Sequence, residues 1–214
     1  MTGLQTVLRS QSHEKTGVFL PVHIEEDWLE PSLADDLLTF AIASESRFES
    51  APVIYSGEKL VNPEMYHASE LQDMGSFTQI MWARVSEALP RLQEEFGMTQ
   101  GQLRAGRPIL TAYGDGAHFR THIDTHILAN KSVVNSPGTR VMTAIVYLHA
   151  HPRRFEGGDL VMHQLGGVEV MKIAPSHNRL VAFPAFAPHE VSKVSCPGAV
   201  FANRRFAVNI PVYR

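Results

Sequence analysis

The sequence predicts a mainly β protein whose core is a double-stranded β-helix, or cupin-like jelly roll, flanked by N-terminal helices. Residues 26–97 carry apolar side chains at helical spacing, whereas the chain from residue 108 onward breaks into short segments rich in Val, Ile, Thr, Tyr and Phe. Many short strands after a helical lead-in are typical of a two-sheet jelly roll with helices on one sheet. We expect one domain over 1–214, with a helical support region at 1–107 and the jelly-roll core at 108–214.

Two helices are expected in the first half of the chain. Residues 31–44 (PSLADDLLTFAIAS) begin with Pro and Ser and repeat apolar residues at helical spacing. Residues 76–96 place apolar side chains from Ile80 to Leu89 near one face of a second helix. Pro90 is expected to kink this helix or to split it in two, because proline lacks the backbone donor.

Eight strands are expected in the second half. Many of the candidate segments are separated by Gly, Pro, Asn or Asp, which favour turns. A barrel built from such strands has a mouth that can hold a ligand. The eight segments are 108–114, 118–124, 140–150, 158–164, 168–173, 179–185, 189–194 and 204–214.

The composition excludes several classes of protein. The 214 residues are 44% hydrophobic and 19% charged, which is a globular composition, and the formal net charge of −3 argues against a nucleic-acid partner. The single cysteine, Cys196, excludes an internal disulfide. Neither a secretory signal nor a run of about 20 apolar residues is visible. We therefore expect a cytoplasmic protein without a membrane partner.

Residues 118–126 (HFRTHIDTH) gather three histidines and one aspartate, which suggests a metal site. In a strand, His122 and Asp124 point to the same face. His189, at the start of a later strand, is the expected third ligand, while His126 lies on the same alternation and competes with it. Two histidines and one carboxylate leave three positions of an octahedral metal open, as in non-haem Fe(II) oxygenases. A histidine-rich surface strand is the alternative.

Five segments follow one another in an order that resembles a known family. They read AYGDGAHFRTHID, RVMTAIVYLHA, FEGGDLVMH, RLVAFPAFAPHEV and RRFAVNIPVYR. Together they resemble the iron- and 2-oxoglutarate-dependent dioxygenases, most closely the prolyl-4-hydroxylase-like branch, over about residues 108–212. The resemblance implies that His122, Asp124 and His189 hold Fe(II).

The resemblance also implies a pocket for the distal carboxylate of 2-oxoglutarate, which needs a cation such as arginine. Arg205 shares a strand face with small or polar residues, which suits a ligand cavity, whereas Arg204 shares its face with bulky apolar ones. Arg205 is therefore the expected anchor and Arg204 the alternative. In the family, tyrosines at the places of Tyr147 and Tyr113 line this pocket.

The activity implied is that of a dioxygenase. Fe(II), 2-oxoglutarate and O₂ would hydroxylate an unactivated C–H and release succinate and CO₂, with ascorbate as a candidate reductant. The carboxylate of Asp124 favours hydroxylation, because related halogenases lack it. The expected substrate is a small molecule, an amino acid, or a peptidyl or carrier-bound residue. Arg120, on the alternation of His122, is a candidate for binding a substrate carboxylate.

Two other functions use the same residues. A non-catalytic sensor would bind metal or 2-oxoglutarate without turnover. A zinc hydrolase would use the same two histidines and aspartate, but it needs a general base and no arginine anchor inside the barrel. Nucleic-acid demethylation is disfavoured, because no basic stripe interleaved with aromatics is present.

Overall fold

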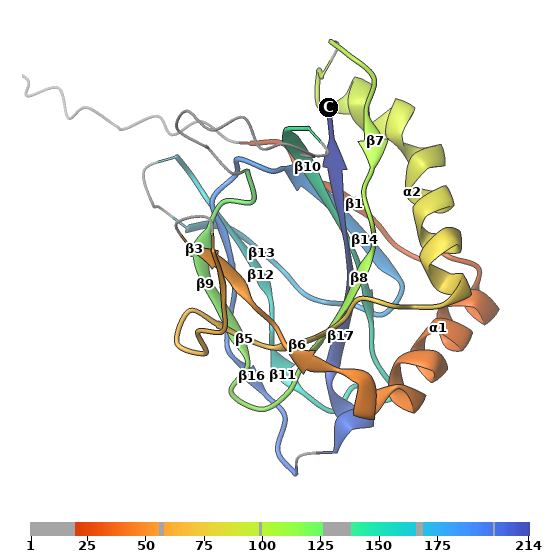
Figure 1. Ribbon diagram of the computed structural model, residues 1–214, viewed down its shortest axis with the longest axis vertical. Helices are drawn as coiled ribbons and strands as arrows, with labels where there is room; N and C mark the ends of the chain where they lie inside the picture. Colours follow the sequence, from red (N-terminus) through yellow and green to blue (C-terminus); the bar gives the residue numbers. More distant parts are fainter. Residues whose placement is uncertain (1–19, 56–57, 99, 126–137, 166–168, 199) are drawn as a thin grey trace, which may run out of the picture.

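Two antiparallel sheets face each other, and two helices cover the outer face of the larger sheet (Figure 1). The computed structural model describes residues 20–55, 58–98, 100–125, 138–165, 169–198 and 200–214. The layers are therefore helix, larger sheet and smaller sheet. None of the described helices is long and apolar enough to cross a membrane.

The helices form where the apolar spacing predicted them. Helix α1 spans Pro31–Ala43, with its proline in the first turn, and α2 spans Ser76–Glu95. Pro90 does not split α2, which continues through it. Short 3₁₀ turns follow at Glu45–Arg47 and Phe201–Asn203. Each helix buries one face against the larger sheet; the buried residues are Ala34, Leu37, Leu38 and Ala41 of α1, and Met81, Val85, Leu89 and Leu92 of α2.

The larger sheet has its C-terminal strand near the centre. Its order is β1-β14-β10-β17-β8-β6-β2, and β7 also pairs with β17. The strands are β1 His23–Glu25, β2 Glu49–Ser50, β6 Ser69–Leu71, β7 Arg104–Ala105, β8 Ile109–Tyr113, β10 Arg140–Leu148, β14 Arg179–Pro184 and β17 Arg205–Tyr213.

The smaller sheet carries the histidine-rich segment. Its order is β13-β12-β15-β9-β5. The strands are β5 Tyr66–His67, β9 His118–His122, β12 Leu160–His163, β13 Glu169–Ile173 and β15 His189–Val191. Two short pairs complete the described strands: β3 Val53–Tyr55 with β4 Glu58–Leu60, and β11 Glu156–Gly157 with β16 Val194–Ser195.

The eight predicted strands are present and form a jelly roll. Strands β8, β10, β14 and β17 lie in the larger sheet, and β9, β12, β13 and β15 lie in the smaller one. Along β17 the side chains of Phe206, Val208 and Ile210 pack toward the helices, while Ala207 packs between the sheets. The alternation along this strand therefore separates the two apolar cores, as the sequence predicts.

The first half of the chain contains strands as well as helices, which the sequence did not predict. Strand β6 pairs with β8 in the larger sheet, and β5 pairs with β9 in the smaller one. These strands are only two or three residues long, so each offers too few alternating positions for a recognisable pattern.

Candidate active site

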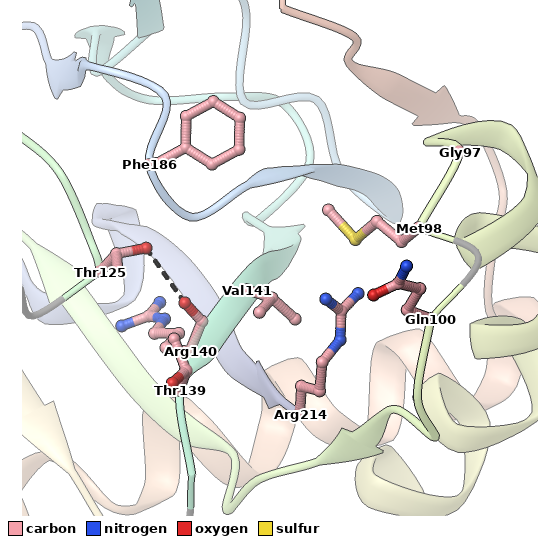
Figure 2. A pocket seen from close by; sticks show the side chains of 9 residues that line it. All are labelled: Gly97, Met98, Gln100, Thr125, Thr139, Arg140, Val141, Phe186 and Arg214. Carbon is pink, nitrogen blue, oxygen red and sulfur yellow. Dashed lines mark hydrogen bonds between the residues drawn. The ribbon is translucent and has the colours of Figure 1, made fainter.

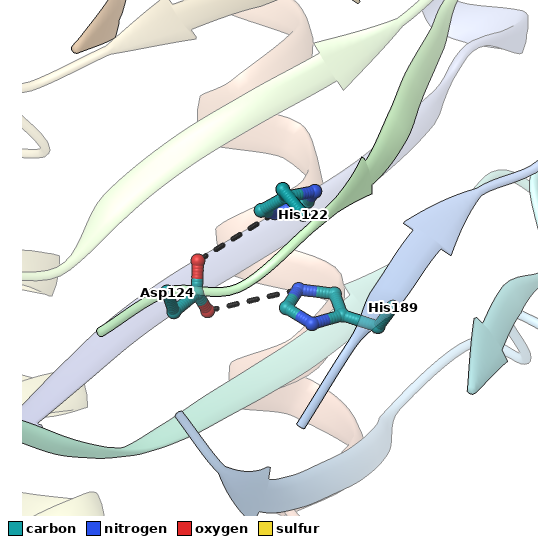
Figure 3. Close-up of side chains that lie close together, drawn as sticks. All are labelled: His122, Asp124 and His189. Atoms are coloured by element: carbon teal, nitrogen blue, oxygen red, sulfur yellow. Dashed lines mark ion pairs between the residues drawn. The ribbon is translucent and has the colours of Figure 1, made fainter. Parts of the chain in front are cut away.

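Three potential metal ligands meet where β9 ends beside the start of β15. His122 is the last residue of β9 and pairs across the sheet with His189, the first residue of β15. The Asp124 carboxylate lies 3.6 Å from Nε2 of His122 and 3.7 Å from Nε2 of His189 (Figure 3). The three candidate ligand atoms all lie within 4.8 Å of one another. The structure thus brings together the residues that the sequence singled out.

Asp124 reaches this position by a different route from the predicted one. Strand β9 ends at His122, and the backbone N–H groups of Asp124 and Thr125 both donate to the carbonyl of Ala185, at 2.7 and 3.1 Å. This carbonyl belongs to the turn between β14 and β15. The turn that leads to His189 therefore also holds Asp124, so the two ligands are positioned by one local structure.

The histidine rings are oriented by backbone carbonyls. Nδ1 of His122 donates to the carbonyl of Arg120, and Nδ1 of His189 donates to that of Ala187, both at 2.8 Å. A carbonyl only accepts, so Nδ1 carries the proton and Nε2 keeps its lone pair for a metal. Burial lowers the pKa of His189 to about 4, despite the opposing charge of Asp124, so this ring stays neutral at physiological pH.

Asp124 stays ionised although it is largely buried. Burial raises its pKa, but the Arg140 guanidinium and the two histidines outweigh that effect and hold the pKa well below its usual range. One carboxylate oxygen, Oδ2, accepts from Nη2 of Arg140 at 2.9 Å and from Oγ1 of Thr143 at 2.6 Å. An ionised carboxylate with two imidazole nitrogens is a donor set that suits non-haem Fe(II).

A buried arginine lies in the same space between the sheets. The guanidinium of Arg205, 1% exposed, stacks between the rings of Tyr113 and Tyr147, whose centroids lie 4.5 and 4.8 Å from Cζ. Its Nε donates to the carbonyl of Gly158 at 2.8 Å. Its Nη1 and the hydroxyl of Tyr147 are buried without a hydrogen-bond partner. Because unpaired buried donors are costly, these two atoms mark a place for an anionic ligand.

The neighbouring arginine has different surroundings. Arg204 is half-buried, and its Cζ lies 4.7 Å from the ring of Phe201. The space around Arg205 depends on Gly158, where a Cβ atom would come within 2.7 Å of Cδ of Arg205. Gly158 has a φ of +70°, which also favours glycine. These contacts suit the GGDL segment, because a side chain there would displace the arginine.

A row of aromatic rings connects the arginine pocket with the metal ligands. Tyr113 lies 6.2 Å from Tyr66, which stacks on Phe119 at 4.0 Å, and Phe119 stacks on His122 at 3.6 Å. Phe183, from the core between the sheets, lies 4.6 Å from His189. The two candidate sites therefore line one interior.

The second half of the chain matches a known family. Residues 108–212 match the model of the 2OG-Fe(II) oxygenase superfamily. This part of the chain belongs to the 2OG-Fe(II) oxygenase superfamily.

Curated relatives of this chain include PKHD-type hydroxylases. An uncharacterized PKHD-type hydroxylase from Synechocystis sp. is 25% identical over 146 residues, which is 64% of this chain and 46% of that protein. A PKHD-type hydroxylase from Caulobacter vibrioides is 30% identical over 88 residues, or 41% of this chain and 37% of that protein. The matched part of the chain therefore spans less than half the length of these relatives.

Comparison with solved structures shows that the fold of this chain is similar to that of prolyl-4-hydroxylases. A prolyl-4-hydroxylase from Pseudomonas putida aligns with a TM-score of 0.63 at 18% identity, covering 91% of this chain and 93% of that chain. A prolyl hydroxylase from Trichoplax adhaerens, solved with a hypoxia inducible factor peptide fragment, gives 0.66 at 17% identity, covering 90% and 83%.

An open groove of about 490 Å³ lies beside the candidate metal centre (Figure 2). Thr125, next to Asp124, donates from Oγ1 to the carbonyl of Arg140 on its wall at 3.0 Å. Phe186, which is 46% exposed, follows the carbonyl that holds Asp124. The groove is lined by Gly97, Met98, Gln100, Thr125, Thr139, Arg140, Val141, Phe186 and Arg214.

The surroundings of Arg120 differ from those expected from the sequence. A β-bulge between Phe119 and His122 puts Phe119, not Arg120, against the ring of His122, and the side chain of Arg120 is exposed. The alternation on which we based Arg120 therefore does not hold. His126 lies outside the described residues.

Arg140 and Thr143, which contact Asp124, were not predicted. Both lie on β10, 16 and 19 positions after Asp124. The local signal was a polar Thr143 between apolar neighbours in β10.

Proposed function

We propose that this chain is an Fe(II)- and 2-oxoglutarate-dependent hydroxylase. The observation that carries the proposal is the pairing of two sites in one interior. His122, Asp124 and His189 offer two nitrogens and a carboxylate oxygen within 4.8 Å, and Arg205 keeps an unpartnered buried donor next to the free Tyr147 hydroxyl. A zinc hydrolase has no use for this second pocket.

His122, Asp124 and His189 would hold Fe(II), which with 2-oxoglutarate and O₂ supplies the oxidising power for attack on a C–H bond. The protein holds both imidazoles by their Nδ1 hydrogen bonds, so that both Nε2 lone pairs face the carboxylate. The neutral state of His189 means that no proton has to leave this ring before a metal binds.

Arg205, Tyr147 and Tyr113 would hold 2-oxoglutarate by its distal carboxylate. Nη1 of Arg205 and the Tyr147 hydroxyl are donors without partners, which a carboxylate could accept together. Both tyrosines are buried, so the carboxylate would be shielded from water and its ion pair with Arg205 would be strong. Ascorbate stays a prediction.

We propose further that the target C–H belongs to a residue of a peptide or another extended chain. The groove beside Asp124 is open and offers an apolar wall at Phe186 and a cation at Arg214. A small metabolite would fill the barrel mouth without needing such a neighbouring groove. The Trichoplax structure with a bound peptide fragment supports the same substrate class. Binding of substrate by Arg120 and the absence of a nucleic-acid partner stay predictions.

We propose that residues 1–214 act as one oxygenase domain. Strands β5 and β6 come from the first half of the chain and pair with β9 and β8 of the second half. Tyr66 of β5 also stacks on Phe119, which stacks on His122. Residues 1–107 would therefore contribute directly to the interior around the metal site, beyond their helical support.

The test is an anaerobic titration of the metal-free protein with Fe(II) and then 2-oxoglutarate. We expect the weak visible charge-transfer band of a chelated keto acid, its loss in His189→Ala, and its retention in His126→Ala. If the band is lost in His126→Ala and retained in His189→Ala, then His126 is the third ligand in place of His189. Succinate release in air then separates an enzyme from a sensor. A wild-type protein that binds zinc tightly and shows no band would refute the oxygenase function.

A further inference from the structure

The two oxygens of the Asp124 carboxylate have different surroundings. Oδ2 accepts from Arg140 at 2.9 Å and from Thr143 at 2.6 Å, and Nη2 of Arg140 also donates to Oγ1 of Thr143 at 2.9 Å. These three groups form a closed ring of hydrogen bonds. Both oxygens lie near a ligand histidine, Oδ1 at 3.6 Å from Nε2 of His122 and Oδ2 at 3.7 Å from Nε2 of His189, so the two hydrogen bonds to Oδ2 are what distinguishes them. Oδ1 is therefore the oxygen that is available to a metal.

The number of bound carboxylate oxygens decides how many positions a metal has left. Two histidines and one carboxylate oxygen leave three positions of an octahedron, and 2-oxoglutarate takes two of them through its carboxylate and keto oxygens. If both oxygens of Asp124 bound the metal, 2-oxoglutarate would fill the remaining two. No position would be left for O₂.

We propose that Arg140 and Thr143 are positioning residues that keep Asp124 a one-oxygen ligand, and thereby keep a coordination position free beside bound 2-oxoglutarate. Only the second part of this proposal, the position kept free beside 2-oxoglutarate, rests on the proposed function. The first part, that Asp124 binds through one oxygen, applies to any divalent metal at this site.

The surroundings of the two residues support this role. Thr143 is 1% exposed and the Arg140 side chain is 21% exposed, so water competes little for Oδ2. Both lie on β10, which pairs with β14 on one side and β17 on the other. Their backbone positions are therefore fixed by the larger sheet. Such support is typical of residues that orient metal ligands.

The test compares Thr143→Val, which keeps the shape and removes the hydroxyl, with Thr143→Ser, which keeps the hydroxyl. Infrared difference spectra between the zinc-loaded protein and its Asp124→Asn variant report the Asp124 carboxylate stretches. A one-oxygen ligand separates the asymmetric and symmetric stretches widely, and a two-oxygen ligand narrows the separation. We expect a wide separation in wild type and Thr143→Ser, and a narrow one in Thr143→Val.

The second measurement uses nitric oxide as a probe of the free position. With Fe(II) and saturating 2-oxoglutarate, we expect nitric oxide to bind about tenfold more weakly to Thr143→Val and to Arg140→Met. Arg140→Lys keeps one donor and should recover part of the affinity. The visible band of bound 2-oxoglutarate should persist in all variants, because the substitutions change only the coordination position that 2-oxoglutarate leaves free.

The outcomes separate the two proposals. A two-oxygen carboxylate in the wild-type zinc form, no zinc binding in wild type, or equal spectra in Thr143→Val and Thr143→Ser would overturn the role of Arg140 and Thr143. So would equal loss of zinc in all variants, because that indicates a purely structural ion pair. A narrowed separation in Thr143→Val without any succinate release in wild type would uphold their role and reject the proposed function.

Discussion

Replacing Arg205 by methionine should abolish most binding of 2-oxoglutarate. The guanidinium is 1% exposed, its Nε bonds to the Gly158 carbonyl at 2.8 Å, and its Nη1 has no partner. Among the described residues, no carboxylate forms an ion pair with Arg205. A bound carboxylate would therefore be its ionic partner, and methionine removes the guanidinium that this carboxylate would contact while filling a similar volume.

The magnitude follows from the burial of the pair. Removing one partner of a buried ion pair costs about 3–5 kcal/mol. At about 1.4 kcal/mol for each factor of ten, the Kd for 2-oxoglutarate should rise roughly 100- to 4,000-fold. Tyr147→Phe removes one hydrogen bond to a charged group, worth about 1.5–3 kcal/mol, so the Kd should rise roughly 10- to 100-fold.

The assay is anaerobic titration of the Fe(II) protein, followed by the visible band, with thermal unfolding alongside. Arg204→Met is the matched control, because that guanidinium lies on the ring of Phe201 and should leave the Kd within about threefold. Without ligand, Arg205→Met should melt no lower than wild type, since a buried charge without an ionic partner is replaced by an apolar group. A Kd that changes in Arg204→Met but not in Arg205→Met would refute the assignment.

Three further predictions concern backbone, pH and metal. Gly158→Ala should lower the free energy of unfolding in urea by about 1–3 kcal/mol, because the new Cβ would lie 2.7 Å from Cδ of Arg205. Gly75→Ala, where φ is +56° and no atom lies within 4 Å of the new Cβ, should lose only the free energy that comes from backbone strain. Equal losses in the two variants would contradict this. Burial is the main cause that lowers the pKa of His149 and His177 below 6.5, so the unfolded chain binds protons at a higher pH than the folded one, and the free energy of unfolding should fall as the pH drops below about 6.5. Urea midpoints at about pH 7.5 and 5.5 test this. An unchanged dependence of the midpoint on pH in the variant with both histidines replaced by asparagine would contradict it. Chelation of the metal should lower the Tm and added Co(II) should restore it, whereas a Tm indifferent to both would argue against a metal site.

Several strands of the second half could be predicted because they are continuous apolar segments between turn residues. Segment 140–150 is long, apolar and rich in β-branched residues, and segment 179–185 is apolar after its first arginine; they became β10 and β14. The alternation from Arg205 along β17 also predicted which side chains face the interior. Local sequence carries this information because a strand has a period of two residues.

The parts that were missed depend on irregular or distant contacts. The bulge in β9 exchanges the expected neighbour of His122, Arg120, for Phe119, and a bulge has no reliable mark in one sequence. Asp124 is held by the carbonyl of Ala185, 61 positions later, rather than by the strand. The contact of Arg140 with Asp124 likewise exists only once β10 lies beside the end of β9.

The central place of β17 has a consequence for synthesis of the chain. Strand β17 lies between β10 and β8, and Arg205 pairs with Tyr113, 92 positions earlier. Until residues 205–213 leave the ribosome, β8 and β10 each have one unpaired edge, which invites aggregation. Contacts this distant in sequence also form slowly. Folding of the larger sheet and completion of the arginine pocket are therefore one late event, and a chain released before residue 205 would offer chaperones or proteases two open strand edges.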